Sequence, residues 1–596
     1  SGIAPGIYQD AYMTHHGPRY LVNPLKVSKR QIPPDDFKDL KINQDAYIKG
    51  QWSSPIDWNV TAIHSILLPN DSIMTFGTFG IMNKEKIDTR ANKKITLTDG
   101  TEIERDRGDY QWHMHDVNSG VDFDIWRFNE GYGEDAHTFY REPIVMDSFC
   151  SVVRVLDNEN VFIVGGNKNP RTDIPDTQAG TMIFNIKSGT FKRTPDLNFK
   201  RWYGSAIRTA DEKLIIVGGK DLVNDIPSIT PEIMDLKNIA AGWRILNKAT
   251  SRSLFGQETL EEYFYPRSYL SSDGNIVGIS NNKIWVMDKD DDYRSFQTGE
   301  IPLATGGIVS YLENINPNNE DHTNHNEHGS KGEDVTKLKI VTMGAPVGPT
   351  TSTVMIEKDK VFLFGGKQAG EEYTSSNQVY KIDFSNNFKP SITELNPMSF
   401  PRSNANATIL PNGEIFINGG EAYNDHKFSI FTPEIYNTQT ETSKKLSQGY
   451  FRRNYHSTAL LMPDGTILVS GGDVWNSEIF YPPYLFTKDW NNKTILSKRP
   501  KIINFKKIIN RGKINIEIDQ NSSQDIEMFT IISTGSTTHA QGSEPKFRSL
   551  KFNKNTNNSY EVDIPMNKNE LTNGTYMIFA ITSSGVPSVG KIVFLN

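Results

Sequence analysis

Four short motifs carry residues whose side chains could do metal or redox chemistry. Cys150 is the only cysteine in the 596 residues and ends the segment Asp-Ser-Phe-Cys. Tyr203 lies in Arg-Trp-Tyr-Gly-Ser, Tyr455 and His456 are adjacent in Arg-Asn-Tyr-His-Ser, and His539 ends Gly-Ser-Thr-Thr-His. Two imidazoles and two phenols suit Cu(II), which favours tetragonal nitrogen and oxygen coordination. The chemistry is available only if the fold brings these side chains together.

Each of these residues also has an ordinary structural explanation. A single cysteine is most often a small, inert, buried side chain, and aromatic residues such as Tyr203 and Tyr455 are common in strands. A histidine that follows a tyrosine is unremarkable alone, as is one in a loop of a small β domain. The motifs gain meaning from the elements that would position them across about 400 residues of chain.

A repeated phrase predicts these elements. About four apolar residues followed by a glycine pair occur at 161–166, 214–219, 361–366, 415–420 and 467–472. Neighbouring copies are about 50 residues apart, a period typical of kelch repeats, and the remaining gap is about three such periods. Weaker copies near residues 60–77 and 265–286 add to the series. The pattern predicts an all-β fold, a seven-bladed kelch-type β-propeller.

The rest of the chain reads differently. After residue 499 the glycine pairs stop and short alternating strands begin, which indicates an immunoglobulin-like β-sandwich. We therefore expect an N-terminal extension at residues 1–45, the propeller with the functional site at 46–495, and the C-terminal β-sandwich at 496–596.

Composition narrows the classes of function. Hydrophobic residues make up 36% and charged residues 23%, which is typical of a soluble globular protein. The net charge of −7 gives no reason to expect a nucleic-acid partner. The apolar runs are far shorter than the roughly 20 residues that span a bilayer, so no membrane span is expected. The oligomeric state stays open.

In their order along the chain, the four motifs resemble those of the galactose oxidase and glyoxal oxidase family of copper-radical oxidases, in its bacterial kelch form. Cys150 precedes the first glycine-pair strand, as the family's cross-linking cysteine does, and Tyr203 precedes the second, where the family has its radical tyrosine. Tyr455 with His456 resembles the family's Tyr-His ligand pair. His539 resembles its remaining histidine ligand, which the C-terminal domain supplies.

The resemblance implies a Cu2+ ion bound by Tyr203, Tyr455, His456 and His539. It also implies a Cys150–Tyr203 thioether as a protein-derived radical cofactor, so that Cys150, Tyr203 and Tyr455 are the catalytic residues. Oxidation of a primary alcohol or aldehyde removes two electrons, and copper stores one, so the modified tyrosine is the second store. Tyr455 would take the substrate's proton, and O2 would leave as hydrogen peroxide.

Two departures from galactose oxidase bear on this expectation. Galactose oxidase covers its thioether with a tryptophan just after the second-blade glycine pair, where this chain has Lys220 to Asn224 and no aromatic residue. What shields the radical instead stays open, with Trp475 as one candidate. Glu421 stands where galactose oxidase has a glutamine, so galactose is not expected as the substrate.

Two functions from different classes remain. The first is the oxidase, acting on a small-molecule or glycan primary alcohol or aldehyde. The alternative is a non-catalytic kelch propeller that binds glycans or protein partners. The mass of the protein separates them, because a thioether removes two hydrogens. The resemblance also implies an extracellular or cell-envelope location. The sequence begins without the features of a signal peptide, and whether one was removed stays open.

Overall fold

Strands dominate the described part of the chain. The computed structural model describes residues 7–14, 17–22, 40–53, 56–58, 60–79, 94–96, 102–104, 122–132, 134–141, 146–168, 178–302, 350–367, 375–422, 429–449, 451–472, 476–522 and 525–596. The α-helices in these residues are single turns, α1 (Ala46–Lys49) and α4 (Arg252–Phe255). None of the described helices is long and apolar enough to cross a bilayer. The predicted all-β fold is confirmed.

Five consecutive sheets share one construction, in which strands that follow one another along the chain pair antiparallel. Their strands are β11 (Val152–Val155), β12 (Asn160–Val164), β13 (Thr181–Asn185) and β14 (Thr190–Thr194); β15 (Trp202–Arg208), β16 (Lys213–Asp221), β18 (Glu232–Asp235) and β19 (Trp243–Ile245); β20 (Arg267–Leu270), β21 (Ile276–Ser280), β22 (Lys283–Asp288) and β23 (Arg294–Glu300); β24 (Ser352–Glu357), β25 (Lys360–Phe364), β26 (Val379–Asp383) and β27 (Ser391–Leu395); β28 (Ser403–Ile409), β29 (Ile415–Glu421), β30 (Glu434–Asn437) and β31 (Thr442–Lys445). One sheet per sequence period is the construction that the kelch pattern predicts.

Two further sheets combine strands that are distant in sequence. One contains β5 (Val60–Leu68), β6 (Ser72–Phe79), β9 (Asp122–Arg127) and β10 (His137–Arg141), and is extended by β41 (Ser536–Thr538) and β42 (Gln541–Gly542). The other contains β32 (Ser457–Leu461), β33 (Ile467–Gly471) and β34 (Asn476–Tyr481), and β3 (Gln51–Trp52) completes it. Because β3 precedes the repeats and β34 ends them, this pairing joins the two ends of the repeat region. The number of seven blades remains a prediction.

The glycine pairs allow backbone segments of neighbouring strands to approach each other closely. The apolar residues before each pair are buried, as in β33, whose five residues are all buried. Gly471 has a φ of +72°, and a Cβ there would lie 2.4 Å from the carbonyl oxygen of His456 and 2.5 Å from that of Ala62. Only glycine permits this approach, so the paired glycines follow from how closely the chain packs at this end of the sheets.

Buried ion pairs lie within two of these sheets. Arg201 and Glu232 are fully buried, with 3.0 Å between Nη2 and Oε2, and Nη1 of Arg201 donates to the carbonyl oxygen of Gly218 at 2.7 Å. Arg402 and Glu434 repeat the arrangement in a later sheet, also fully buried and 3.0 Å apart. In the first case the pair anchors the segment that carries Tyr203 to its own sheet.

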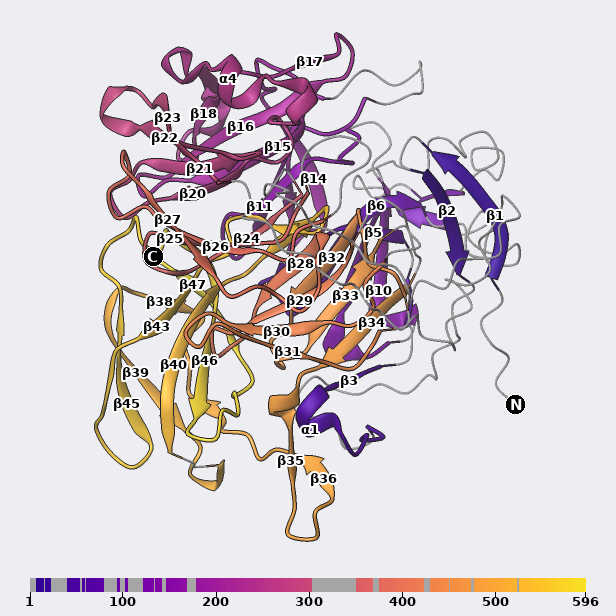
Figure 1. Ribbon diagram of the computed structural model, residues 1–596, viewed down its shortest axis with the longest axis vertical. Helices are drawn as coiled ribbons and strands as arrows, with labels where there is room; N and C mark the ends of the chain where they lie inside the picture. The colour runs from indigo at the N-terminus through magenta and orange to yellow at the C-terminus, as the bar shows by residue number, and fades with distance from the viewer. Residues whose placement is uncertain are drawn as a thin grey trace.

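The C-terminal strands form two sheets around a separate apolar core. One sheet contains β37 (Ile502–Ile503), β39 (Gly512–Ile518), β45 (Ser559–Ile564) and β44 (Phe552–Lys554), and the other contains β38 (Ile508–Ile509), β47 (Lys591–Leu595), β46 (Gly574–Thr582), β40 (Ile526–Ser533) and β43 (Phe547–Leu550). These strands are the yellow and orange unit at the lower left of Figure 1. Ile516 and Val562 from one sheet share the core with Phe529 from the other, as in a β-sandwich. The boundaries at residues 45 and 495 remain predictions.

One segment of the C-terminal domain leaves its own sheets and joins the repeat region. β41 and β42 lie between β40 and β43 in sequence, but β41 pairs antiparallel with β5, with Thr538 opposite His64. This pairing carries the following residue, His539, to the propeller.

Candidate metal centre

The five predicted side chains come from four separate segments. Cys150 lies just before β11 and Tyr203 within β15, while Tyr455 and His456 lie just before β32 and His539 follows β41. Each repeat-region residue is at the start of the first strand of its sheet. Equivalent positions of three different sheets therefore meet, and β41 adds the fourth segment.

The imidazoles and phenols converge. The rings of His456 and His539 are 4.6 Å apart between centroids, with their planes at 86°. The ring of Tyr455 stacks on His456 at 3.9 Å, and the ring of Tyr203 is 5.0 Å from that of His539. The hydroxyl groups of Tyr203 and Tyr455 are hydrogen-bonded to each other. Two nitrogen and two oxygen donors in one place fit copper(II).

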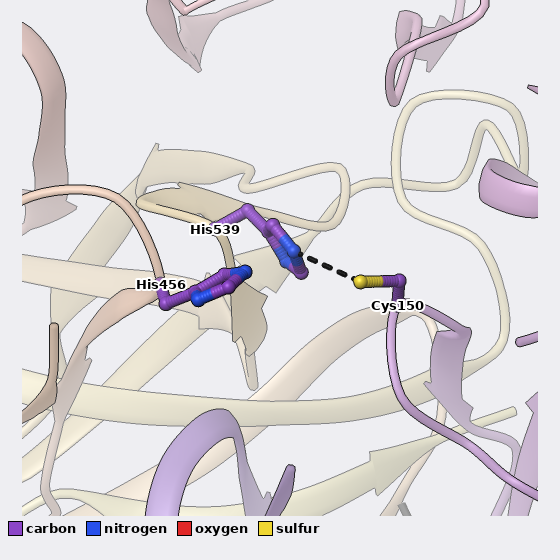
Figure 2. Close-up of side chains that lie close together, drawn as sticks. All are labelled: Cys150, His456 and His539. Carbon is purple, nitrogen blue, oxygen red and sulfur yellow. Dashed lines mark hydrogen bonds between the residues drawn. The ribbon is translucent and has the colours of Figure 1, made fainter. Parts of the chain in front are cut away.

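The sulfur of Cys150 belongs to the same cluster. Its Sγ lies 3.2 Å from Nε2 of His539, the contact drawn in Figure 2. One ligand atom from each of Cys150, His456 and His539 falls within 4.8 Å of the others. The main-chain N–H of Tyr203 donates to the carbonyl oxygen of Cys150 at 3.0 Å, so these two residues are neighbours across adjacent sheets. The position of Cys150 is compatible with two roles for its sulfur: a soft metal ligand, or one end of a thioether bond to the Tyr203 ring.

The backbone of the site is unusual. Cys150, Tyr203, His456 and His539 all have a positive φ, at 61°, 72°, 68° and 49°. A residue with a side chain pays roughly 1–3 kcal/mol for such a conformation, which persists only where surrounding contacts hold it. Strain concentrated on four of the five candidate residues is typical of a functional site.

Burial separates the site's closed side from its accessible side. Cys150 and His456 are 0% exposed and His539 is 1% exposed, whereas Tyr455 is only partly buried. Burial raises the pKa of Tyr203 well above its usual value of 10, and the neighbouring Tyr455 and Cys150 raise it further. Without a cation the Tyr203 phenol stays protonated. A bound metal ion reverses this preference, because it stabilises the phenolate.

Trp202, which the sequence-based reasoning passed over, covers Tyr203. Their rings stack with 3.6 Å between centroids and 30° between planes. Adjacent residues of a strand normally point to opposite faces, so the motif gave no reason to expect this contact. Lys220 pairs with Asp225 at 2.7 Å and also with Glu258. Trp475, the candidate cover proposed from the sequence, lies outside the described residues.

Two further residues were missed. Tyr265, 2% exposed, has its ring 5.2 Å from Tyr203, and its main-chain N–H donates to the carbonyl oxygen of Tyr203 at 2.8 Å. It occupies the position in its sheet that Tyr203 occupies in the preceding one, so an alignment of the repeats would have found it. His64 is buried beside Cys150. In the sequence, it could have been noticed as a single histidine within a nine-residue strand that is otherwise mostly apolar.

Fold and site together define an all-β protein in which a C-terminal domain completes a centre of histidines and tyrosines at the end of a ring of sheets. Residues 499–595 match the family model "Galactose oxidase-like, Early set domain". The chain is 24% identical to a galactose oxidase of Gibberella zeae over 465 residues, 75% of this chain and 60% of that protein. It is 26% identical to an aldehyde oxidase of Arabidopsis thaliana over 428 residues, 66% of this chain and 63% of that protein.

A solved structure agrees on the fold. A fungal alcohol oxidase in complex with copper superimposes with a TM-score of 0.68 at 19% identity, over 92% of this chain and 99% of that one. The C-terminal domain matches the galactose oxidase-like family model, and the chain is similar in sequence to galactose and aldehyde oxidases and in fold to a copper-containing alcohol oxidase. It spans about three fifths of the length of the galactose oxidases that it matches.

Proposed function

We propose that this protein is a copper-radical oxidase that converts a primary alcohol or an aldehyde with O2 and releases hydrogen peroxide. The observation that carries the proposal is the convergence of His456 and His539 with the hydrogen-bonded hydroxyls of Tyr203 and Tyr455. Its relatives are oxidases named for galactose and for aldehydes.

The four donors have distinct tasks in this proposal. His456 and His539 are buried and would hold the metal. Bound copper would act as a Lewis acid for the substrate oxygen and would store one of the two electrons. Tyr455 is the more exposed of the two phenols, so it is the residue placed to meet substrate. We assign to it the transfer of the hydroxyl proton, for which a phenolate oxygen is a competent base.

Tyr203 and Cys150 form the second electron store. A bond between the sulfur and the phenol ring forms with loss of two hydrogens, which O2 accepts. The thioether enriches the ring in electrons and eases removal of one. The oxidised Tyr203 would then take a hydrogen atom from the substrate carbon. An alcohol, or an aldehyde that has added water, loses two electrons and two protons in total, and O2 takes them up as hydrogen peroxide.

We assign Cys150 this role rather than a permanent role as a metal ligand. Tyr203 and Cys150 are joined through the main chain at 3.0 Å and share one buried cluster. A thioether sulfur would leave the two imidazoles and two phenols, a set that suits Cu(II) better than a thiolate does. An extracellular or cell-envelope location is part of the same proposal.

Aerobic copper loading tests the proposal. We expect intact mass to fall by about 2 Da, the thiol of Cys150 to become untitratable, and peroxide to appear with members of a panel of primary alcohols and aldehydes. Cys150→Ser is the matched control, because it keeps both imidazoles and both phenols and cannot form the bond. A loaded wild-type protein that keeps its thiol and its full mass contradicts the radical cofactor. A glycan-binding propeller would show neither the mass loss nor peroxide.

A further inference from the structure

His64 is a buried histidine that lies next to the metal centre without being one of its predicted ligands. It sits in the middle of β5, where all nine residues are buried, and is itself 2% exposed. Its ring stacks on Phe76 with 4.3 Å between centroids and 5° between planes. Burying a polar ring in such a strand costs free energy unless its nitrogens are hydrogen-bonded. The hydrogen-bond partners of His64 therefore indicate its role.

Two segments of the site meet at one nitrogen of this ring. The main-chain N–H of Cys150 donates to Nε2 of His64 at 3.2 Å. The hydroxyl oxygen of Thr538 lies 3.5 Å from the same Nε2, and 2.6 Å from Nδ1 of His539. Thr538 is also the strand partner of His64 in the β41–β5 pair. One side chain of the propeller thus connects the segment of the cross-linking cysteine with the segment that supplies a histidine ligand.

The nitrogen of His539 that would bind a metal determines where the protons lie in the hydrogen bonds that link His539, Thr538 and His64. Nε2 of His539 faces Sγ of Cys150 and the other ligands, so a metal would bind there and the proton of His539 must be on Nδ1. That N–H donates to the hydroxyl oxygen of Thr538, so the Thr538 hydroxyl hydrogen is available to His64 or to Tyr265. Nε2 of His64 accepts from the main-chain N–H of Cys150, so this nitrogen carries no proton, and the Thr538 hydroxyl lies 3.5 Å from it. Burial, and next to it the neighbouring His456, lower the pKa of His64 well below its usual value.

We propose that His64 is a positioning residue that locks the Cys150 segment and, through Thr538, His539 into the geometry needed for thioether formation and metal binding. The inference rests on the function proposed above and deepens it. Cys150 and His539 both hold a positive φ, and such backbones need outside contacts to persist. His64 supplies one for each segment, and Thr538 fixes the ring orientation of His539 as outer hydrogen-bond partners of metal-bound histidines do.

The first test needs no metal. In the metal-free protein we compare the rate at which iodoacetamide alkylates Cys150 under native conditions. His64→Leu removes the acceptor and introduces an apolar side chain of similar size, so we expect the Cys150 segment to open more often and the rate to rise about tenfold. His64→Gln keeps an acceptor oxygen and should recover much of the protection. His137→Leu is the matched control: His137 lies in the same sheet, its side chain is 5% exposed, and its Nδ1 is 2.7 Å from Oδ2 of Asp124.

The second test separates the two arms. Thr538→Val removes only the hydroxyl, so copper affinity, measured by chelator competition, should fall about 10- to 100-fold while alkylation of Cys150 stays near the wild-type rate. Thr538→Ser should restore the affinity. His64→Leu should lower the affinity and also the fraction of chains that lose about 2 Da on aerobic loading. Thr538→Val and His64→Gln keep the inference testable if His64→Leu does not fold.

The outcomes distinguish this inference from the function beneath it. If His64→Leu folds and matches His137→Leu in alkylation rate, copper affinity and mass loss, His64 is a packing residue and the inference is wrong. If the wild-type protein binds no copper and keeps its full mass, the oxidase proposal fails. The alkylation series on metal-free protein still decides whether His64 positions Cys150.

Discussion

Trp202 and Tyr203 are neighbours in the sequence, yet their rings stack with 3.6 Å between centroids and 30° between planes. The positive φ of Tyr203, 72°, breaks the alternation of a regular strand and brings both side chains to one side. The indole thus lies against the ring that we propose to carry the radical. We therefore expect the indole to shield this ring in place of an aromatic residue between Lys220 and Asn224.

Removing this indole should expose the oxidised tyrosine. We expect Trp202→Leu to shorten the lifetime of the oxidised enzyme at least several-fold, measured as decay of its visible absorption, because water and reductants then reach the Tyr203 ring. Trp243→Leu is the matched control, since Trp243 stacks on Phe162 in the propeller and not on Tyr203. Equal decay in the wild type and Trp202→Leu would show that another group shields the radical.

Substitution of the ligands should separate metal binding from turnover. His456→Ala and His539→Ala should each remove most bound copper, because each takes away one of only two imidazoles. Tyr455→Phe should retain copper and lose peroxide production, since it removes the proposed base and keeps both imidazoles. Metal content by elemental analysis and peroxide assays check both. Near-normal turnover of Tyr455→Phe would contradict the proton transfer assigned to it.

The buried ion pair before Tyr203 should matter far more than a pair on the surface of the same sheet. Glu232→Gln leaves the guanidinium of Arg201 buried without its counter-charge, and we expect it to lower the free energy of unfolding by about 3–5 kcal/mol. The side chains of Lys213 and Asp235 are 31% and 38% exposed and lie 3.2 Å apart, so Asp235→Asn should leave the free energy of unfolding almost unchanged. Urea denaturation of the two variants measures the contrast, and equal losses would contradict it.

Buried tyrosines should make the fold sensitive to alkali. Burial, with Asp464, raises the pKa of Tyr132 to about 12, and burial, with Glu394, raises that of Tyr380 to about 12. In the unfolded chain these phenols ionise near pH 10, so the unfolded state loses protons first as pH rises. Stability from this source is complete below pH 10 and should decline between pH 10 and 12. Tyr380→Phe should decline less, measured as the urea midpoint against pH, and an unchanged slope would contradict the assignment.

The repeats alone determined the class of fold. Apolar runs that end in paired glycines at a period near 50 residues can be recognised locally, because each strand buries its own side chains and each glycine pair answers a local need for close backbone approach. The all-β prediction is therefore confirmed. The five chemistry-bearing residues were also found from their motifs, and the structure places them together, while their roles remain predictions.

Other features of the site depend on contacts that no local pattern encodes. Trp202 lies on Tyr203 only because a positive φ, held by neighbouring sheets, breaks the strand's alternation. His64 meets Cys150 and Thr538 only because β41, more than 450 residues further along the chain, pairs with β5. The sequence determined which side chains could do chemistry and which strands would carry them. Packing between distant segments decided which neighbours orient and shield them, because those contacts exist only once the ring of sheets and the C-terminal domain have come together.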